Sequence, residues 1–420
     1  NGTLVFEGRQ DSAAAFKEFR IELDDGTEDS NIVDSYNYDK PINSVTTENQ
    51  SNIKKVTTCT NEEFFAARVN SAALKPSSAR YDMRIMQIEE AALLQIEDSI
   101  LKAKEIYGKD RIAVCVGSCD NGTEFSVAGH RKYFAQNAFP ADYNLEIQGA
   151  DYVSTFIAEK YDLSGPVNTF STACSSSACA IIKGAELILS GLVDAAIVGG
   201  IDIASDTTLV GFNGLEAVSS EITNPFSKNR HGITLGDGAA FFVIAKDNFE
   251  NLENPVKLLG WGESSDAYHM TSPDPSGAGA EKAIRRALQM AKIEPNEVSY
   301  VNLHGTGTKF NDSMESKAVD SIFGEYKVPC STTKAVTGHT LGAAAALELS
   351  ICYKTLIENI DKICNNVILP IQVWDKVKDD ELPELNFVNE KNINVDNKIK
   401  ICASNSFAFG GANACLVIGL

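Results

Sequence analysis

Apolar residues along this chain form short runs that predict strands, and several runs are followed by longer stretches with helical spacing. Pro166–Phe170 is predicted as a strand, and the small and apolar residues of 177–189 follow it at the spacing of a helix. The same succession returns at 328–349, while Ala240–Ile244 and Cys415–Ile418 are predicted strands that each follow a loop of small residues. The recurrence predicts an α/β protein that contains two related units.

A cysteine lies at the first of these strand-to-helix junctions. Cys174 stands in Thr-Ala-Cys-Ser-Ser-Ser, just before the predicted helix. The positive end of a helix dipole favours thiolate, so this position predicts a lowered thiol pKa and a nucleophile. A buried cysteine that only packs is the commoner role on an apolar segment. The position alone leaves both interpretations open.

Two of the five histidines occupy glycine-rich loops at the ends of predicted strands. His304 follows the apolar run that begins near Val298, and His339 follows a second strand and precedes a predicted helix at 343–356. Lys334 belongs to the same loop as His339. One such histidine would be interpreted as a core residue, but two of them beside a lysine fit a catalytic site better.

In chain order these segments resemble the β-ketoacyl-acyl-carrier-protein synthases of the elongating type, which have the thiolase fold. The resemblance implies a five-layered α-β-α-β-α architecture made of two similar halves in one compact unit. The halves are expected at 1–255, with Cys174, and at 256–420, with His304 and His339. The matching motifs are Thr172–Cys174, Ala195–Gly200, Gly211–Phe212, Asn224–Ser227, Arg230–Gly232, Gly236–Ala239, Asp266–Thr271, the two histidine loops and Asn405–Asn413.

The resemblance also implies a chemistry. Cys174 would accept an acyl group from the phosphopantetheine of an acyl carrier protein, which splits one difficult condensation into two half-reactions. A malonyl thioester would then lose carbon dioxide, and neutral His304 and His339 would donate hydrogen bonds to the enolate oxygen. Lys334 would keep a histidine neutral, and Glu315 would pair with that lysine. This chemistry uses no metal and no cofactor beyond the carrier's arm.

The closing glycine-rich motif implies an oxyanion hole and a gate. In the family, the backbone N–H groups of the nucleophile and of the second phenylalanine, here Phe409, stabilise the oxyanion. Phe409 is also the expected gate to the acyl site, beside Phe407, and Gly410 and Gly411 suit a loop that moves. The segment 264–277 matches the loop that packs against this gate.

Three further features concern substrate and carrier. Asp120 and Asn121 stand where relatives line the far end of the acyl tunnel with apolar side chains, so one hypothesis is a short, unsaturated or polar-ended substrate, for example with a hydroxyaryl group. The alternative is that Asp120 turns into a loop and never meets substrate. Ile233, the third candidate for the acyl pocket, stands where relatives often have phenylalanine, and the change is expected to affect packing. Arg80 and Arg84 are candidates for docking the carrier, or else solvated helix charges.

Composition narrows the other possibilities. The chain has 420 residues and a net charge of -20, which argues against binding to nucleic acid. No apolar run approaches the ~18 residues of a membrane span. None of the ten cysteines forms a Cys-x-x-Cys pair, so neither a zinc site nor a disulfide framework is expected. The scattered cysteines instead predict a reducing, cytoplasmic setting. Residues 22–52 are expected to form a surface excursion, and the native N-terminus is expected to be missing.

Alternatives to a condensing enzyme remain. A non-catalytic partner of the chain-length-factor kind would shape a tunnel in a heterodimer, but such partners usually lack the cysteine that this chain retains. A coenzyme A thiolase or an initiating synthase would replace one histidine or add a second catalytic cysteine. The elongating reading predicts a homodimer or a heterodimer with a ketosynthase-like subunit. It leaves open whether the pathway makes fatty acids, polyketides or polyenes.

Overall fold

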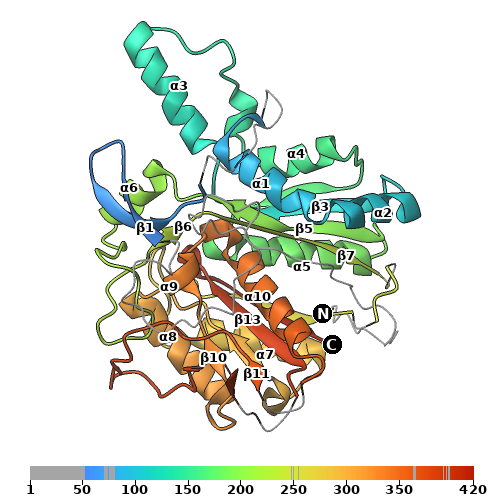
Figure 1. Ribbon diagram of the computed structural model, residues 1–420, viewed down its shortest axis with the longest axis vertical. Helices are drawn as coiled ribbons and strands as arrows, with labels where there is room; N and C mark the ends of the chain where they lie inside the picture. The colour runs from blue at the N-terminus through green and yellow to red at the C-terminus, as the bar shows by residue number, and fades with distance from the viewer. Residues whose placement is uncertain are drawn as a thin grey trace.

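The computed structural model describes residues 53–70, 74, 81–246, 248, 250–253, 255–362, 366–390, 392–393, 395 and 398–420. The predicted excursion at 22–52 and Arg80 lie outside these residues. Within them, two sheets are stacked with helices between them and on their outer faces (Figure 1). The five layers expected from the thiolase fold are therefore present.

The two sheets share one strand order. The first runs β4 (Val167–Phe170), β3 (Ile112–Gly117), β5 (Ala195–Asp202), β7 (Gly238–Ala245), and only β7 is antiparallel to its neighbour. The second repeats the pattern with β10 (Cys330–Ser331), β9 (Tyr300–Asn302), β13 (Ile401–Phe407) and β14 (Ala412–Gly419), and then adds β8 (Lys257–Ser265). The predicted repeat is confirmed strand by strand.

The core lies on both faces of each sheet. Ala113 and Cys115 of β3 pack toward the central helices α5 (Ser176–Leu189) and α10 (Ala344–Glu358), which lie between the sheets. The alternate β3 residues pack against α1 (Arg84–Leu94), α2 (Glu97–Tyr107) and α4 (Tyr152–Lys160) on the outside. Helices α7 (Ala278–Ala291) and α8 (Lys309–Val319) cover the outer face of the second sheet. Strands buried on both faces need continuous apolar sequences, as β5 and β7 have.

Smaller elements surround this frame. A hairpin of β1 (Ile53–Thr57) and β2 (Glu63–Ala67) is extended by β6 (Leu235–Gly236). Helix α3 (Thr123–Gln136) projects from the body at the top of Figure 1. The remaining elements are η3 (Leu145–Gln148), η4 (Ala173–Ser175), α6 (Asp206–Gly214), η5 (Pro295–Glu297), η6 (Asp320–Gly324), α9 (Lys334–Thr337), η7 (Leu341–Ala343), β11 (Val367–Ile368), β12 (Asn392–Ile393) and η8 (Phe409–Gly411).

Glycines let the first turn of α5 lie directly on the strand ends. A Cβ atom on Gly117, the last residue of β3, would lie 2.2 Å from the backbone nitrogen of Ser177. A Cβ atom on Gly200 of β5 would lie 2.7 Å from the Ser177 Cβ. Such distances are too short for any side chain, so both positions require glycine. This close approach sets the depth at which Cys174, just before α5, is buried.

We expect Gly117→Ala to lower the free energy of unfolding by about 2–3 kcal/mol, because the added methyl group meets backbone that cannot move independently. Urea unfolding measures the change. Gly211→Ala is the matched control, since a Cβ atom there has nothing within 4 Å. A wild-type unfolding midpoint for Gly117→Ala would contradict the packing described here.

Candidate active site

Cys174 lies on a sharp turn between β4 and α5. The preceding residue, Ala173, has a φ of 51°, in the left-handed region that non-glycine residues adopt rarely. Ser176 stabilises this turn, because its Oγ accepts a hydrogen bond from the Thr172 N–H at 2.9 Å and donates one to the Ala173 carbonyl at 2.6 Å. The turn directs the Cys174 sulfur toward the second half of the chain.

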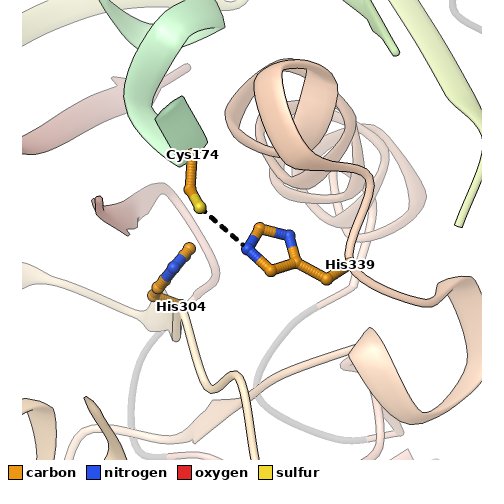
Figure 2. A group of neighbouring side chains, drawn as sticks. All are labelled: Cys174, His304 and His339. Carbon is orange, nitrogen blue, oxygen red and sulfur yellow. Dashed lines mark hydrogen bonds between the residues drawn. The ribbon is translucent and has the colours of Figure 1, made fainter. Parts of the chain in front are cut away.

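His339 reaches this sulfur from the other half. Its Nε2 lies 3.0 Å from Cys174 Sγ (Figure 2). The backbone of His339 is held on both sides, because its N–H donates to the Thr234 carbonyl and its carbonyl accepts from the Gly236 N–H. The Leu341 N–H donates to His339 Nδ1 at 3.3 Å. Since Nδ1 accepts, the imidazole proton belongs on Nε2, facing the sulfur.

His304 lies in the loop that follows β9 and is fully buried. Lys334 Nζ lies 3.5 Å from His304 Nδ1 and also donates to the His304 carbonyl. An ammonium group can only donate, so Nδ1 accepts and the proton of His304 also belongs on Nε2. In the described part of the chain this Nε2 has no hydrogen-bond partner. The ligand atoms of Cys174, His304 and His339 all lie within 4.8 Å of one another (Figure 2).

Both imidazoles are uncharged. Burial lowers the pKa of His304 and of His339 well below the usual value, and the positive charge of Lys334 lowers both further. Two neutral rings thus present Nε2–H groups to the space around Cys174. A thioester oxygen that gains negative charge in this space would accept hydrogen bonds from both.

The thiol itself differs from the prediction. Burial raises the pKa of Cys174 to about 12, although Lys334 and a hydrogen bond from the Phe409 backbone act in the opposite direction. The lowered pKa predicted from the helix N-terminus is therefore wrong for the resting protein. The physical reason is magnitude, since a helix dipole contributes at most about 2 kcal/mol, or about 1.5 pKa units.

The partner of Lys334 is Glu348, not Glu315 as predicted. Lys334 is 1% exposed, and its ammonium pairs with the Glu348 carboxylate on α10. Burial raises the pKa of Glu348 to about 7, and Lys334 opposes this shift. The position of Glu348 within the apolar first half of α10 is the signal that could have revealed it, because unpaired acids are almost never fully buried.

Glu315 instead fixes the loop that carries His304. Its two carboxylate oxygens accept the backbone N–H groups of His304 and Gly305, each at 2.7 Å, and Asn405 Nδ2 lies 3.4 Å from Oε1. Burial raises the pKa of Glu315 to about 7, and the two backbone donors lower it. Glu315 therefore holds the backbone N–H of His304, while Lys334 contacts the ring and the backbone carbonyl of His304.

The predicted gate residues lie beside the cysteine. The Phe409 ring packs against Phe212 at 5.9 Å, and Phe407 lies edge-on to His304 at 6.1 Å. Gly410 has a φ of 83° and donates its N–H to the Met270 carbonyl at 2.7 Å, while the Asp266 N–H donates to the Gly411 carbonyl. The segment 264–277 thus contacts the Phe409 loop, as the sequence predicted.

A cavity of about 360 Å³ opens onto Cys174. Its wall includes Ile233, as predicted, together with both histidines and the two phenylalanines at 407 and 409. Residues that the sequence analysis did not name as acyl-pocket candidates also line it, and several of them belong to the motifs that it did name. They are Phe212, Leu215, Glu216, Ala217, His231, Thr271, Ser272, Pro273, Thr306, Thr308, Lys309, Phe310, Asn311 and Asn413.

Asp120 and Asn121 do not line this cavity. The Asp120 carboxylate is buried and accepts hydrogen bonds from the Gly122 N–H and the Tyr152 hydroxyl, both at 2.7 Å. Asn121 is exposed. Asp120 therefore shapes its own loop, which is the alternative that the sequence left open, and it supplies no polar end to the cavity.

Arg84 is not available for docking a carrier. Its guanidinium pairs with Asp237, which is buried, and with Glu124, and only 14% of its side chain is exposed. These two carboxylates already satisfy its charge, so the predicted docking role is replaced by a structural one. Arg80, the second candidate, lies outside the described residues.

Within the described residues, Cys174, His304 and His339 form the only group of three side chains with metal-ligand atoms close together. Their Nε2–H groups and the ammonium of Lys334 suit an anionic oxygen better than a cation. Four buried oxygens on β9, α10 and β13 lack partners in the described part of the chain, and oxygens of this kind suit water or a hard cation. They belong to Asn302, Glu348, Ser404 and Asn405.

We expect Glu348→Gln to destabilise the protein by about 3–5 kcal/mol, because it leaves the buried Lys334 ammonium without its counterion. The double variant Lys334→Met/Glu348→Gln should recover most of this loss in urea unfolding, since no unpaired charge remains. Glu315→Gln is the control, and Lys334→Met should not rescue it. Rescue of Glu315→Gln instead of Glu348→Gln would show that the pairing is assigned to the wrong acid.

Known proteins are similar to this chain in sequence and in architecture. Residues 25–249 match the N-terminal domain of β-ketoacyl synthases, and residues 256–362 match their C-terminal domain. A 3-oxoacyl-[acyl-carrier-protein] synthase 2 of Coxiella burnetii is 34% identical over 81% of this chain and 83% of its own length. A synthase of the same name from Vibrio harveyi is 31% identical over 82% and 83% of the two chains.

Among solved structures, one chain in the complex of a ketosynthase with its chain length factor from Xenorhabdus doucetiae is 38% identical. It superposes with a TM-score of 0.80 and covers 88% of this chain and 90% of its own. Sequence matches that span both halves agree with the two repeated sheets and with the cysteine and histidines between them. The chain belongs to the β-ketoacyl synthase family.

Proposed function

We propose that this protein condenses a Cys174-bound acyl group with a malonyl thioester, both delivered by an acyl carrier protein, to give a 3-oxoacyl thioester. The observation that carries the proposal is the contact of Cys174 Sγ with His339 Nε2, beside a His304 Nε2–H that has no partner in the described residues. A nucleophile and two aimed donors would have no purpose in a subunit that only shapes a tunnel, so the chain-length-factor alternative is not favoured.

The first half-reaction loads the enzyme. Cys174 sulfur attacks the carbonyl carbon of the carrier thioester, and its proton ends on the departing phosphopantetheine thiol. The oxyanion of the tetrahedral intermediate accepts hydrogen bonds from the backbone N–H groups of Phe409 and Cys174. Phe409 is suited to this role because its backbone already donates toward the Cys174 sulfur.

The second half-reaction forms the carbon–carbon bond. When the malonyl thioester loses carbon dioxide, the electron pair of the broken bond stays on the thioester and forms an enolate. The enolate oxygen accepts hydrogen bonds from the Nε2–H groups of His304 and His339. The enolate carbon attacks the acyl-cysteine carbonyl, and collapse of the intermediate expels the Cys174 thiolate, which takes a proton from solvent. No redox step occurs, so we propose that no cofactor is required beyond the carrier's own phosphopantetheine.

We expect wild-type protein to gain the mass of the acyl group when it is mixed with acyl-carrier thioesters, and Cys174→Ala to gain none. His304→Ala and His339→Ala should still load, but should decarboxylate a malonyl thioester about 10²–10³-fold more slowly, because each removes one donor to the enolate. Intact-protein mass and carbon dioxide release measure the two steps. No loading by any carrier, even with a partner subunit present, would contradict the proposal.

We further propose that the working enzyme is a dimer that pairs through the open edge of the first sheet. Strand β4 is the terminal strand of that sheet, and its Val167 side chain is 39% exposed. An uncovered edge strand readily pairs with another chain.

No helix among the described residues is long and apolar enough to cross a membrane. The predicted cytoplasmic location stays a prediction.

Sedimentation should show wild-type protein as a dimer, alone or with a co-expressed ketosynthase-like subunit. Val167→Lys should shift it toward the monomer, because a charged side chain on the edge opposes strand pairing. Leu192→Lys is the matched control, since Leu192 is an exposed apolar residue that is not part of β4. A Val167→Lys variant as dimeric as Leu192→Lys would place the interface elsewhere.

A further inference from the structure

Asp202, the last residue of β5, lies directly beneath the turn that follows His339. Its side chain is buried. One carboxylate oxygen, Oδ2, accepts the backbone N–H groups of Gly342 and Cys119, each at 2.8 Å, and Oδ1 accepts the N–H of Ile203 at 3.2 Å. Oδ2 thus holds two segments, at Cys119 and at Gly342, that are far apart in the sequence.

The first of these segments controls the imidazole of His339. Gly342 belongs to η7, and its neighbour Leu341 donates the N–H that fixes His339 Nδ1 as an acceptor. Leu341 has a φ of 49°, a strained conformation that needs support from its surroundings. A Cβ atom on Gly342 would lie 2.7 Å from Asp202 Oδ2, so the turn rests on the carboxylate.

The second segment contacts the turn that carries the nucleophile. The Cys119 Sγ donates to the carbonyl of Ala173 at 3.4 Å and lies 3.7 Å from Ser176 Oγ. Ala173 and Ser176 flank Cys174. The Asp202 carboxylate therefore connects the support of Cys174 to the support of His339.

A buried acid at this place has a cost in stability. The ionisable groups that face Asp202 are Asp120 after β3, Tyr152 on α4 and the thiols of Cys119 and Cys174, and none of them is cationic. Burial, and then Asp120, raises the pKa of Asp202 to about 7. Because this folded pKa exceeds the value of about 4 in the unfolded chain, Asp202 lowers the stability of the fold as the pH rises from about 4 to about 7, and above that range the loss is complete. Packing alone gives no reason for an acid here.

We propose that Asp202 is a positioning residue that, through Gly342 and Leu341, keeps His339 Nδ1 an acceptor and so aims the Nε2–H at the substrate beside Cys174. The inference rests on the proposed condensation activity. It assigns to Asp202 a part in the decarboxylation step, which uses His339, and a smaller part in the loading of Cys174.

The test separates these two steps in the full-length protein. Asp202→Ala should slow decarboxylation of the malonyl thioester about 10- to 100-fold, because the loss of an orienting contact lets His339 move from its productive geometry. Loading of Cys174 should stay within about threefold of wild type. Asp202→Asn should restore decarboxylation to within about threefold of wild type, because its amide oxygen replaces Oδ2 as acceptor.

A double-mutant cycle with His339→Ala distinguishes positioning from a general structural role. In the His339→Ala background, Asp202→Ala should cause no further loss, because the group it positions is gone. Asp120→Ala is the matched control, an acid of the same buried region with no hydrogen bond to the His339 turn in the described part of the chain, and its effect should be equal in both backgrounds. If Asp202→Ala does not fold, Asp202→Ser, whose hydroxyl is too short to reach both N–H groups, takes its place.

Three results would overturn the inference. They are wild-type decarboxylation by Asp202→Ala, an equal loss in both His339 backgrounds, and an Asp202→Asn variant as slow as the alanine variant. If wild-type protein itself neither loads nor decarboxylates, the proposed function fails instead. The two failures are therefore distinguishable from the wild-type controls alone.

Discussion

The contact between the Cys174 sulfur and the His339 imidazole is the interaction on which the rest of this structure depends. The two residues are 165 positions apart and belong to different repeats of the fold. They meet because both central helices, α5 and α10, begin at the same place between the sheets. Gly117 and Gly200 allow the start of α5 to approach the strands, and the turn before α10 rests on Asp202. Catalytic geometry here is a direct result of close backbone packing.

Electrostatics then determine what the meeting residues can do. Lys334 is a buried cation whose charge opposes protonation of His304 and His339, and Glu348 balances that charge inside the protein. A buried ion pair contributes little to stability compared with apolar packing, so its value is the field it creates. The neutral imidazoles are donors without charge, as an enolate site requires. The same burial keeps the resting Cys174 thiol protonated.

Much of this arrangement could be predicted from the sequence, and the parts that could not share a physical reason. The repeated strand-loop-helix pattern revealed the two units, and the glycine-rich loops identified Cys174, His304 and His339, because local chemistry marks them. The sequence could not predict which buried charges pair with each other, because pairing depends on distances between segments that the fold brings together. Glu315 lies on the helix that follows the His304 loop, yet Glu348 meets the lysine. The positive charge of Arg84 suits a docking residue, but two carboxylates pair with its guanidinium.

The central claim is that His304 and His339 are neutral and carry their protons on Nε2. Nitrogen NMR of histidine-labelled protein tests this directly, because only five histidines are present and the other three, His130, His231 and His269, are exposed. The account predicts that two histidines keep a protonated Nε2 and a bare Nδ1 between pH 6 and 8. An imidazolium signal from His304 or His339 at pH 7, or a proton on Nδ1, would contradict it.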